Sequence, residues 1–352
     1  MADEYFLVKA FVMFAVGTHI LFGSRQSVAN AYRKLKLVIT GLTHMLLSRD
    51  KRFKPKVDPG TVEVEPTARG KRVIFIRHGE SEWNEVFNRG FGPSFLVRLV
   101  KAVIREVSML GTRDSVFFDS PLSETGIHQT QELIRFLHKE QASVSPQVAE
   151  AVAVLRGGGQ AGSSMSDDPS SAASASASAP STSSVLAASN LRRAIATGTI
   201  ALWERLVRTK ERFLVHSLLQ EVTINVDGIS LLEHGEVPDP TLSRELGGEV
   251  AFDAEFNDGT KGLSSNGLRR MEGFAEWACS RPEDTVIAVG HSLYFRSFFK
   301  AFLPWSSSHI CKKKKMVNCG VVAFTLYPGL HGGQTGYRID EDSVLTVYGG
   351  FK

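Results

Sequence analysis

The 352-residue chain has only three cysteines, Cys279, Cys311 and Cys319, and all of them lie in its last quarter. An odd number without zinc-like spacing excludes a disulfide framework and a cysteine-based metal centre as organising features. We therefore expect free thiols and a reducing compartment. No other metal-ligating cluster is visible in the sequence, so we also expect neither a metal nor a cofactor.

A strong net charge is also lacking, because 41 Lys and Arg face 37 Asp and Glu, a formal net charge of +4. The charge is unevenly placed: residues 1–72 carry 13 basic and 6 acidic residues, and the remainder carries 28 and 31. A nucleic-acid-binding main domain would carry a basic face itself, so this distribution excludes nucleic acid as a partner. A basic N-terminal arm instead suits contact with anionic membrane lipid.

The sequence has no apolar run of the ~20 residues that span a bilayer comfortably. The longest candidate, Phe6–Phe22, follows Asp3 and Glu4 and precedes basic residues, which is the wrong polarity for a cleaved signal peptide. We expect a membrane anchor that leaves the main domain, which follows it in the chain, in the cytosol. The alternatives are a helix docked on a soluble cytoplasmic protein, or a mitochondrial location. A second apolar and basic stretch, Tyr32–Leu47, is expected to lie along the same surface or to form an ordinary amphipathic helix.

Composition divides the chain into an arm at 1–49, a proline-containing linker at 50–70 and a main domain at 71–352. The Gly, Ser and Ala run at 157–184 cannot bury enough apolar surface to offset its ordering entropy, so we expect a disordered insertion. Its triple glycine is no phosphate-binding P-loop, because no Gly-Lys-Ser/Thr follows.

Four short apolar runs predict buried strands, and helical spacing separates several of them. They are Val73–Ile76, Val185–Ser189, Thr285–Val289 and Val321–Leu326. Alternating strands and helices predict a three-layer α/β/α sandwich around a mostly parallel sheet. Ligands of such sheets bind at the carboxyl ends of the strands.

Three of these strands lead into cations or imidazoles. The first ends in Arg77-His78, the second leads into Arg192-Arg193, and the third ends in Gly290-His291. Guanidinium groups offer forked donors that fit phosphate oxygens, and the helices that follow add their amino-terminal amides. The sequence therefore predicts an anion site at this edge of the sheet.

The order of these motifs resembles that of the histidine phosphatase superfamily, also called the phosphoglycerate mutase-like family. The resemblance rests on RHGES at Arg77–Ser81 with Asn84, on SNLRRAIAT at Ser189–Thr197 and on VGHS at Val289–Ser292. DSPLSETGIHQ at Asp119–Gln129 matches a further element between the first two. The likeness covers roughly residues 71–326, on both sides of the low-complexity run, so we interpret that run as an insertion into one domain.

The resemblance implies that His78 attacks phosphorus and becomes a phosphohistidine. It implies that Arg77, Arg193 and His291 bind the phosphate, with His291 also taking part in catalysis and Asn84 serving as a neutral donor. An imidazole with the ordinary pKa of about 6.5 is mostly neutral at pH 7, so it needs no external base for this attack. Stabilisation of the transferred group is then mainly electrostatic.

The leaving oxygen needs a proton, which the family usually takes from a Glu or Asp after the second arginine. The best match is Glu221, and Glu233 and Asp227 compete for the role.

Two departures favour a phosphatase over a glycolytic mutase. The segment that follows the acid residue in the mutases is absent here, and Ser94–Leu110 forms a basic amphipathic helix that we expect to cover the pocket. We expect a metal-independent phosphomonoester hydrolase acting on a small phosphate ester or a phosphoprotein. The alternatives are a phosphoglycerate mutase-like phosphotransferase and a catalytically silent phosphate-binding scaffold at a membrane.

Overall fold

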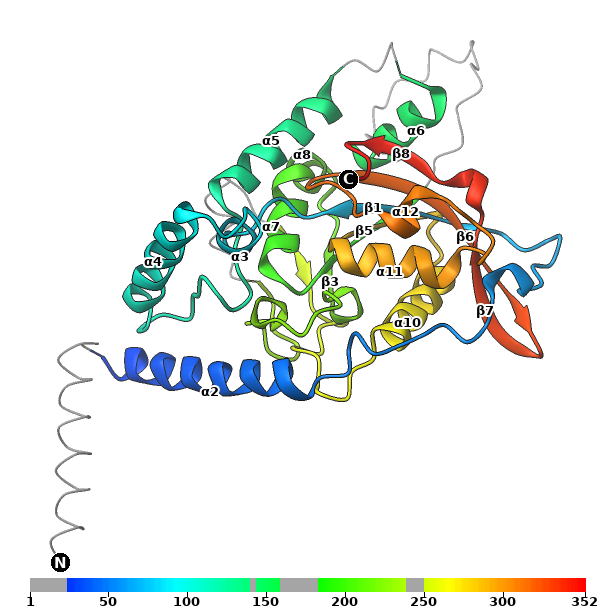
Figure 1. Ribbon diagram of the computed structural model, residues 1–352. Helices are drawn as coiled ribbons and strands as arrows, with labels where there is room; N and C mark the ends of the chain where they lie inside the picture. The colour runs from blue at the N-terminus through cyan, green and yellow to red at the C-terminus, as the bar shows by residue number, and fades with distance from the viewer. Residues whose placement is uncertain (1–23, 140–143, 159–182, 239–249) are drawn as a thin grey trace, which may run out of the picture.

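The structure, a computed structural model, describes residues 24–139, 144–158, 183–238 and 250–352 (Figure 1). The expected anchor Phe6–Phe22 and most of the low-complexity run lie outside these residues. The helices are α2 (Arg25–Leu47), α3 (Glu82–Phe87), α4 (Pro93–Ser108), α5 (Glu124–His138), α6 (Pro146–Leu155), α7 (Arg192–Ala201), α8 (Trp203–Thr209), α10 (Gly267–Ser280), α11 (Ser292–Phe302) and α12 (Ile310–Lys313). The strands are β1 (Lys71–Arg77), β2 (Ser184–Ser189), β3 (Phe213–His216), β4 (Phe252–Asp253), β5 (Thr285–Gly290), β6 (Val321–His331), β7 (Gln334–Ile339) and β8 (Leu345–Tyr348).

The strands form one eight-stranded sheet in the order β4-β3-β2-β5-β1-β6-β7, with β8 also paired to β6. From β4 to β1 every pairing is parallel, whereas β6 runs antiparallel to β1, β7 and β8. The prediction of a mostly parallel sheet is confirmed. The four predicted strands are present as β1, β2, β5 and β6, and the last of them is longer than expected.

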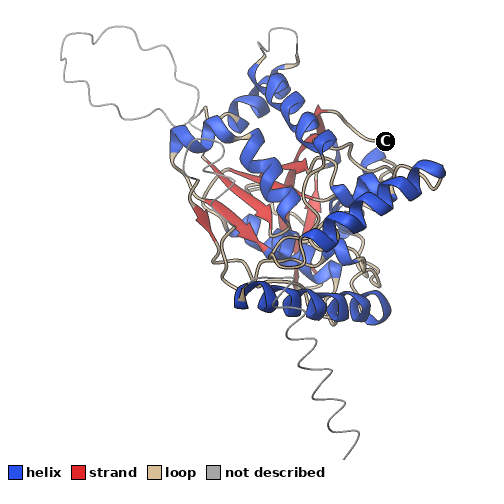
Figure 2. Ribbon diagram, turned by 90° about the vertical axis from the view of Figure 1, so that its left-hand side faces the viewer, coloured by secondary structure: helices blue, strands red, loops and turns tan. Residues whose placement is uncertain are grey.

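Helices cover both faces of the sheet (Figures 1 and 2). Successive side chains of a strand point to opposite faces, and β1 shows this directly. Val73 and Phe75 pack into the core beneath α10 and α11, and Ile74 and Ile76 pack into the core beneath α5 to α8. Because all four side chains are fully buried, a run of four apolar residues is what a central strand of a three-layer sandwich requires.

The elements that flank the low-complexity run pack into the same core. Helix α6, which precedes it, and strand β2, which follows it, both contribute side chains to the apolar cluster on one face of the sheet. The elements on either side of the run therefore belong to one folded unit.

The arm contacts the domain through helix α2, by polar contacts and by Leu37, which packs on a small apolar cluster of the domain. Asn30 Nδ2 donates to the carbonyl of Gly111 at 2.8 Å, and Lys34 Nζ donates to that of Met109 at 2.6 Å. In the described ranges, no helix combines the length and apolar character needed to cross a bilayer. The predicted amphipathic helix over Tyr32–Leu47 is thus present as part of α2.

Helix α4 contains most of the predicted amphipathic helix Ser94–Leu110. It packs on α3 through a small apolar cluster that includes Val86 and Ala102, and Arg105 pairs with Glu82. Since α3 begins five residues after Arg77, the contact places α4 against the segment that follows the first motif.

Candidate active site

The ends of β1 and β5 bring the two motif histidines together. Arg77 pairs with Gly290 in the parallel register, and the His78 amide donates to the Gly290 carbonyl at 3.0 Å. The next residues, His78 and His291, therefore leave the sheet side by side, with their ring centroids 5.0 Å apart. Both imidazoles are buried. The sheet register, rather than any sequence proximity, creates this pair.

A backbone contact selects the tautomer of His78. Its Nδ1 lies within hydrogen-bond distance of the Gly79 carbonyl. A carbonyl oxygen can only accept, so Nδ1 must carry the proton and the neutral ring has its lone pair on Nε2. Gly79 itself has no room for a side chain, because a Cβ would lie 2.6 Å from the Gly126 carbonyl.

The motif Ser189–Thr197 supports both histidines. Ser189 Oγ lies 2.8 Å from His291 Nε2. Thr197 Oγ1 accepts from the Gly79 amide at 3.0 Å and donates to the Arg193 carbonyl at 2.7 Å. The junction of β2 and α7 thus orients the second imidazole and holds the loop that follows the first.

Two buried guanidinium groups belong to the same site. Arg193 donates to the Asp227 carbonyl at 2.8 Å and pairs with its carboxylate at 3.4 Å. Arg77 Nη1 donates to the Met316 carbonyl. Burial lowers the pKa of Arg77 to about 10, which leaves it protonated at neutral pH. Arg192, in contrast, contacts the backbone carbonyls of Asp119 and Ser115, so its role is structural.

The environment keeps both imidazoles neutral. Burial lowers the pKa of His78 well below its ordinary value, and the charges of Arg193 and Arg77 lower it further. Burial and the charge of Arg193 have the same effect on the pKa of His291. A neutral imidazole with a free Nε2 is the form that can attack phosphorus.

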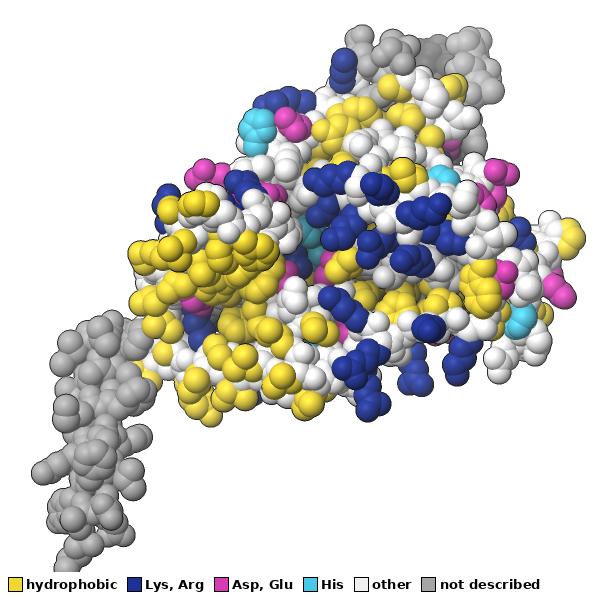
Figure 3. All heavy atoms as spheres, in the orientation of Figure 1, with side chains coloured by type: hydrophobic (Ala, Val, Ile, Leu, Met, Phe, Trp, Pro, Cys, Tyr) yellow, Lys and Arg dark blue, Asp and Glu magenta, His cyan; other side chains and the backbone are white. Residues whose placement is uncertain are grey.

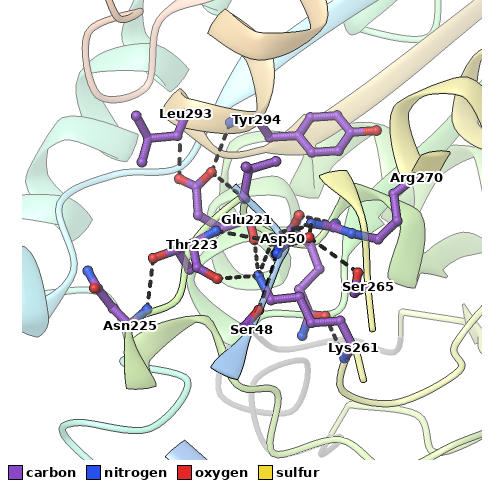
Figure 4. Close-up of polar contacts among 12 residues, drawn as sticks. Ser48, Asp50, Glu221, Thr223, Asn225, Lys261, Ser265, Arg270, Leu293 and Tyr294 are labelled. Atoms are coloured by element: carbon purple, nitrogen blue, oxygen red, sulfur yellow. Dashed lines mark hydrogen bonds and ion pairs between the residues drawn. The ribbon is translucent and has the colours of Figure 1, made fainter. Parts of the chain in front are cut away.

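The side chain of Glu221 lies at the amino terminus of α11, the helix that begins directly after His291. Its carboxylate accepts from the Tyr294 amide at 2.8 Å and from the Leu293 amide at 3.4 Å, as Figure 4 shows. Burial raises the pKa of Glu221, although the charge of Arg193 opposes the rise. A carboxyl group with a raised pKa keeps its proton to a higher pH than usual and can give it to a leaving group.

The two competitors of Glu221 occupy different places. Asp227 is buried against Arg193, and burial raises its pKa as well. Glu233 is 74% exposed in its side chain and pairs with Arg33 of α2. Of the competitors, only Asp227 is part of the buried cluster.

Asn84 lies in the first turn of α3, where its amide donates to Ser81 Oγ, the N-cap of that helix. Its side-chain oxygen accepts from Asn88 Nδ2 at 2.8 Å. The side-chain oxygen of Asn84 is therefore already hydrogen-bonded within α3. Phosphate binding through Asn84 stays a prediction.

The motif Asp119–Gln129 organises the loops around the site. The Asp119 carboxylate accepts from the amides of Arg192 at 2.7 Å and Leu231 at 3.0 Å, which ties three segments together. Gly126 lets α5 approach the first motif, because a Cβ there would lie only 2.0 Å from the Glu80 carbonyl.

A buried ion-pair network behind Glu221 was missed at the level of sequence. Asp50 accepts from Lys261 Nζ at 2.6 Å and from Arg270 Nη2 at 2.8 Å, with its side chain fully buried (Figure 4). Lys261 also donates to the carbonyls of Glu221 and Thr223. Asp50 is the first residue of the predicted linker, and nothing in its basic local sequence distinguishes it from a solvated residue.

A basic rim surrounds the buried cluster. Figure 3 shows a hollow with histidine at its floor and Lys and Arg side chains around it. Lys315 is exposed, and its pKa is lowered by partial burial and by the nearby charges of Arg296 and Arg77. Lys51, also exposed, acts electrostatically on both Lys315 and Asp227. Across the part of the chain that is described, no group of three His, Cys, Asp or Glu is placed to hold a metal ion.

Several solved structures are similar to this chain at low identity. A mycobacterial glucosyl-3-phosphoglycerate phosphatase in complex with VO3 matches with a TM-score of 0.35 and 16% identity, over 77% of this chain and 97% of that one. A phosphoserine phosphatase mutant from Entamoeba histolytica in complex with phosphoserine matches with a TM-score of 0.32 and 13% identity, over 76% of this chain and 94% of that one. The ecdysone phosphate phosphatase from Bombix mori in complex with tungstate matches with a TM-score of 0.35 and 13% identity, over 76% of this chain and 91% of that one. No protein-family model and no curated protein matches the sequence. What this chain does therefore has to be inferred from its own residues.

Proposed function

We propose that the protein is a phosphomonoester hydrolase that works through a phosphohistidine on His78. The observation that carries the proposal is the buried pair of neutral imidazoles, 5.0 Å apart, beside the guanidinium groups of Arg77 and Arg193. These cations supply the positive charge that a metal ion supplies in other phosphatases. The substrate is a small phosphate ester or a phosphoprotein.

In the first step, the lone pair of His78 Nε2 forms a bond to phosphorus and the ester P–O bond breaks. Glu221 gives its proton to the departing oxygen, which leaves as an alcohol. Arg77, Arg193 and His291 stabilise the charge on the equatorial oxygens. In the second step, water attacks the phosphohistidine, Glu221 takes up the proton of that water, and the N–P bond breaks to release orthophosphate.

The proposal is tested by hydrolysis of p-nitrophenyl phosphate in the presence of a chelator. His78→Ala is expected to lower kcat by about 10⁴-fold or more, because loss of a nucleophile removes the covalent route. His128→Ala is the matched control, since that imidazole is exposed on α5 and should leave the rate unchanged. Equal rates in the wild type and His78→Ala would refute the mechanism.

The same assay separates the alternatives. A phosphotransferase releases p-nitrophenol without an equal amount of orthophosphate when an acceptor alcohol is present. A silent scaffold binds phosphate but turns over nothing. The anchored location is tested separately: deleting residues 1–24 should weaken the association of the protein with membranes, and unchanged association would refute an anchor in Phe6–Phe22.

A further inference from the structure

Helix α2 has its apolar side turned away from the domain. The helix residues that are buried are Asn30, Lys34, Gly41 and His44. The exposed ones include Val28, Tyr32, Leu35, Ile39, Leu42 and Leu46, spaced alternately by four and three residues so that they form one stripe. A surface helix of a soluble domain normally has the opposite orientation, with the apolar stripe facing the core.

Helix α4 shows the same feature. Its exposed apolar side chains are Leu96, Val97, Val100, Val103, Ile104 and Val107. Among the described residues, fifteen of the twenty-three exposed large hydrophobic side chains lie on α2 and α4. Such a concentration differs from the scattered single residues that are normal on a protein surface, and it marks an interaction site.

The two stripes form one surface, the α2–α4 face. Asn30 and Lys34 of α2 bond to the carbonyls of Gly111 and Met109 at the carboxyl end of α4, which fixes the helices side by side. In Figure 3 the hydrophobic side chains gather over both helices. This surface does not include the buried cluster of the candidate active site.

The charge around the α2–α4 face has one sign on the α2 side. From Arg25 to Arg49 the chain has five Lys and Arg and no Asp or Glu. Directly after α2, Lys51, Arg52, Lys54 and Lys56 are exposed, whereas the one acid among them, Asp50, is buried in its ion pairs. An apolar face with an adjacent basic cluster matches an anionic bilayer surface, because the cluster adds electrostatic attraction to apolar insertion.

We infer that the α2–α4 face lies on an anionic membrane surface, with both helices in the plane of the headgroups. A second copy of the chain is a poorer occupant. The stripe on α2 has heptad spacing, but Lys36 beside it has no acidic partner on α2, so pairing two such helices would bring like charges together. The expected membrane anchor Phe6–Phe22 precedes α2 in the chain and would hold the α2–α4 face close to a bilayer. The inference does not depend on the proposed phosphatase activity.

The test places tryptophan on the face in the full-length chain. Leu42→Trp on α2 and Ile104→Trp on α4 are mixed with vesicles of phosphatidylcholine and phosphatidylserine that carry brominated acyl chains. Leu330→Trp, an exposed position near the β6–β7 turn, is the control. We expect the added fluorescence at positions 42 and 104 to be largely lost and that at 330 to be retained. Loss should be weaker with phosphatidylcholine alone and at high salt, which screens the basic cluster.

A second measurement compares vesicle binding. The double variant Ile39→Gln/Ile104→Gln is expected to bind about tenfold more weakly than Leu330→Gln, because two apolar side chains no longer insert. Two outcomes would overturn the inference. One is vesicle binding without quenching at positions 42 and 104, which would assign all membrane contact to Phe6–Phe22. The other is a dimer in light scattering that Ile39→Gln dissociates, which would assign the face to a second copy.

Discussion

Replacing Asp50 by alanine tests whether the N-terminal arm holds the candidate active site together. Asp50 follows α2 within three residues, and its buried carboxylate is the shared partner of Lys261 and Arg270. In turn, Lys261 donates to the backbone carbonyl of Glu221, and Arg270 donates to that of the preceding residue, Gln220. Loss of the carboxylate should therefore weaken both the fold and the position of Glu221.

The expected cost is large because two buried cations lose their partner at once. Removing one member of a buried ion pair destabilises a protein by about 3–5 kcal/mol. At about 2–4 °C per kcal/mol for a domain of this size, Tm should fall by roughly 6–20 °C. Burial and the neighbouring Arg270 already lower the pKa of Lys261 to about 8, so without Asp50 this lysine should lose its proton near neutral pH.

Thermal denaturation by circular dichroism measures the effect, with Glu150→Ala as the control. Glu150 pairs with Arg72 at the surface, where an ion pair contributes about 1 kcal/mol at most. At a temperature where both variants are folded, kcat of Asp50→Ala should fall and that of Glu150→Ala should not. A Tm of Asp50→Ala within a few degrees of the control would refute the reasoning.

The stability that Asp50 contributes should depend on pH, and the direction of its pKa shift predicts how. Burial alone would raise the pKa of Asp50, but the charges of Arg270 and Lys261 outweigh it and the pKa lies below its ordinary value. The stability that this carboxylate contributes is therefore present above its unfolded-state pKa of about 4 and is lost as the pH falls through the lower folded-state value. At pH values below about 8, where Lys261 is protonated, the difference in Tm between the wild type and Asp50→Ala should shrink as the pH falls into the acid range.

Three further predictions concern the proposed catalytic acid, the pH dependence of the reaction and the close approach of α5. Glu221→Gln should lower kcat by about 10²–10⁴-fold, whereas Glu233→Gln, at an exposed position, should leave it unchanged; full activity of Glu221→Gln would assign the acid role to another group. In the wild type, kcat/KM should persist below pH 6.5 because the pKa of His78 is lowered, and it should fall on the alkaline side as Glu221 loses its proton; an acid limb at or above pH 6.5 would contradict this. Gly126→Ala should lower the free energy of unfolding by about 3 kcal/mol or more in urea titration, because the Cβ meets a backbone carbonyl that cannot move aside, whereas Gly92→Ala meets no atom within 4 Å and should be neutral.

The sequence was informative wherever local chemistry and strand order carry the signal. The run Val73–Ile76 predicted a strand that is buried on both faces, because such a strand needs apolar side chains at every position. The polar residues directly after three strands predicted a shared site, because parallel strands end at one edge of a sheet. His78 and His291 are 213 residues apart in the chain and adjacent in the structure for that reason.

The three-layer α/β fold and the identity of the residues at its strand ends could therefore be predicted from the order of the amino acids. The burial of Asp50 between Lys261 and Arg270 could not, because a single carboxylate among basic residues has the same local pattern whether it is solvated or paired. The orientation of α2 could not be predicted either. A helical hydrophobic period defines a stripe, but which side of the helix faces the domain depends on partners such as Gly111 and Met109, more than sixty residues away along the chain.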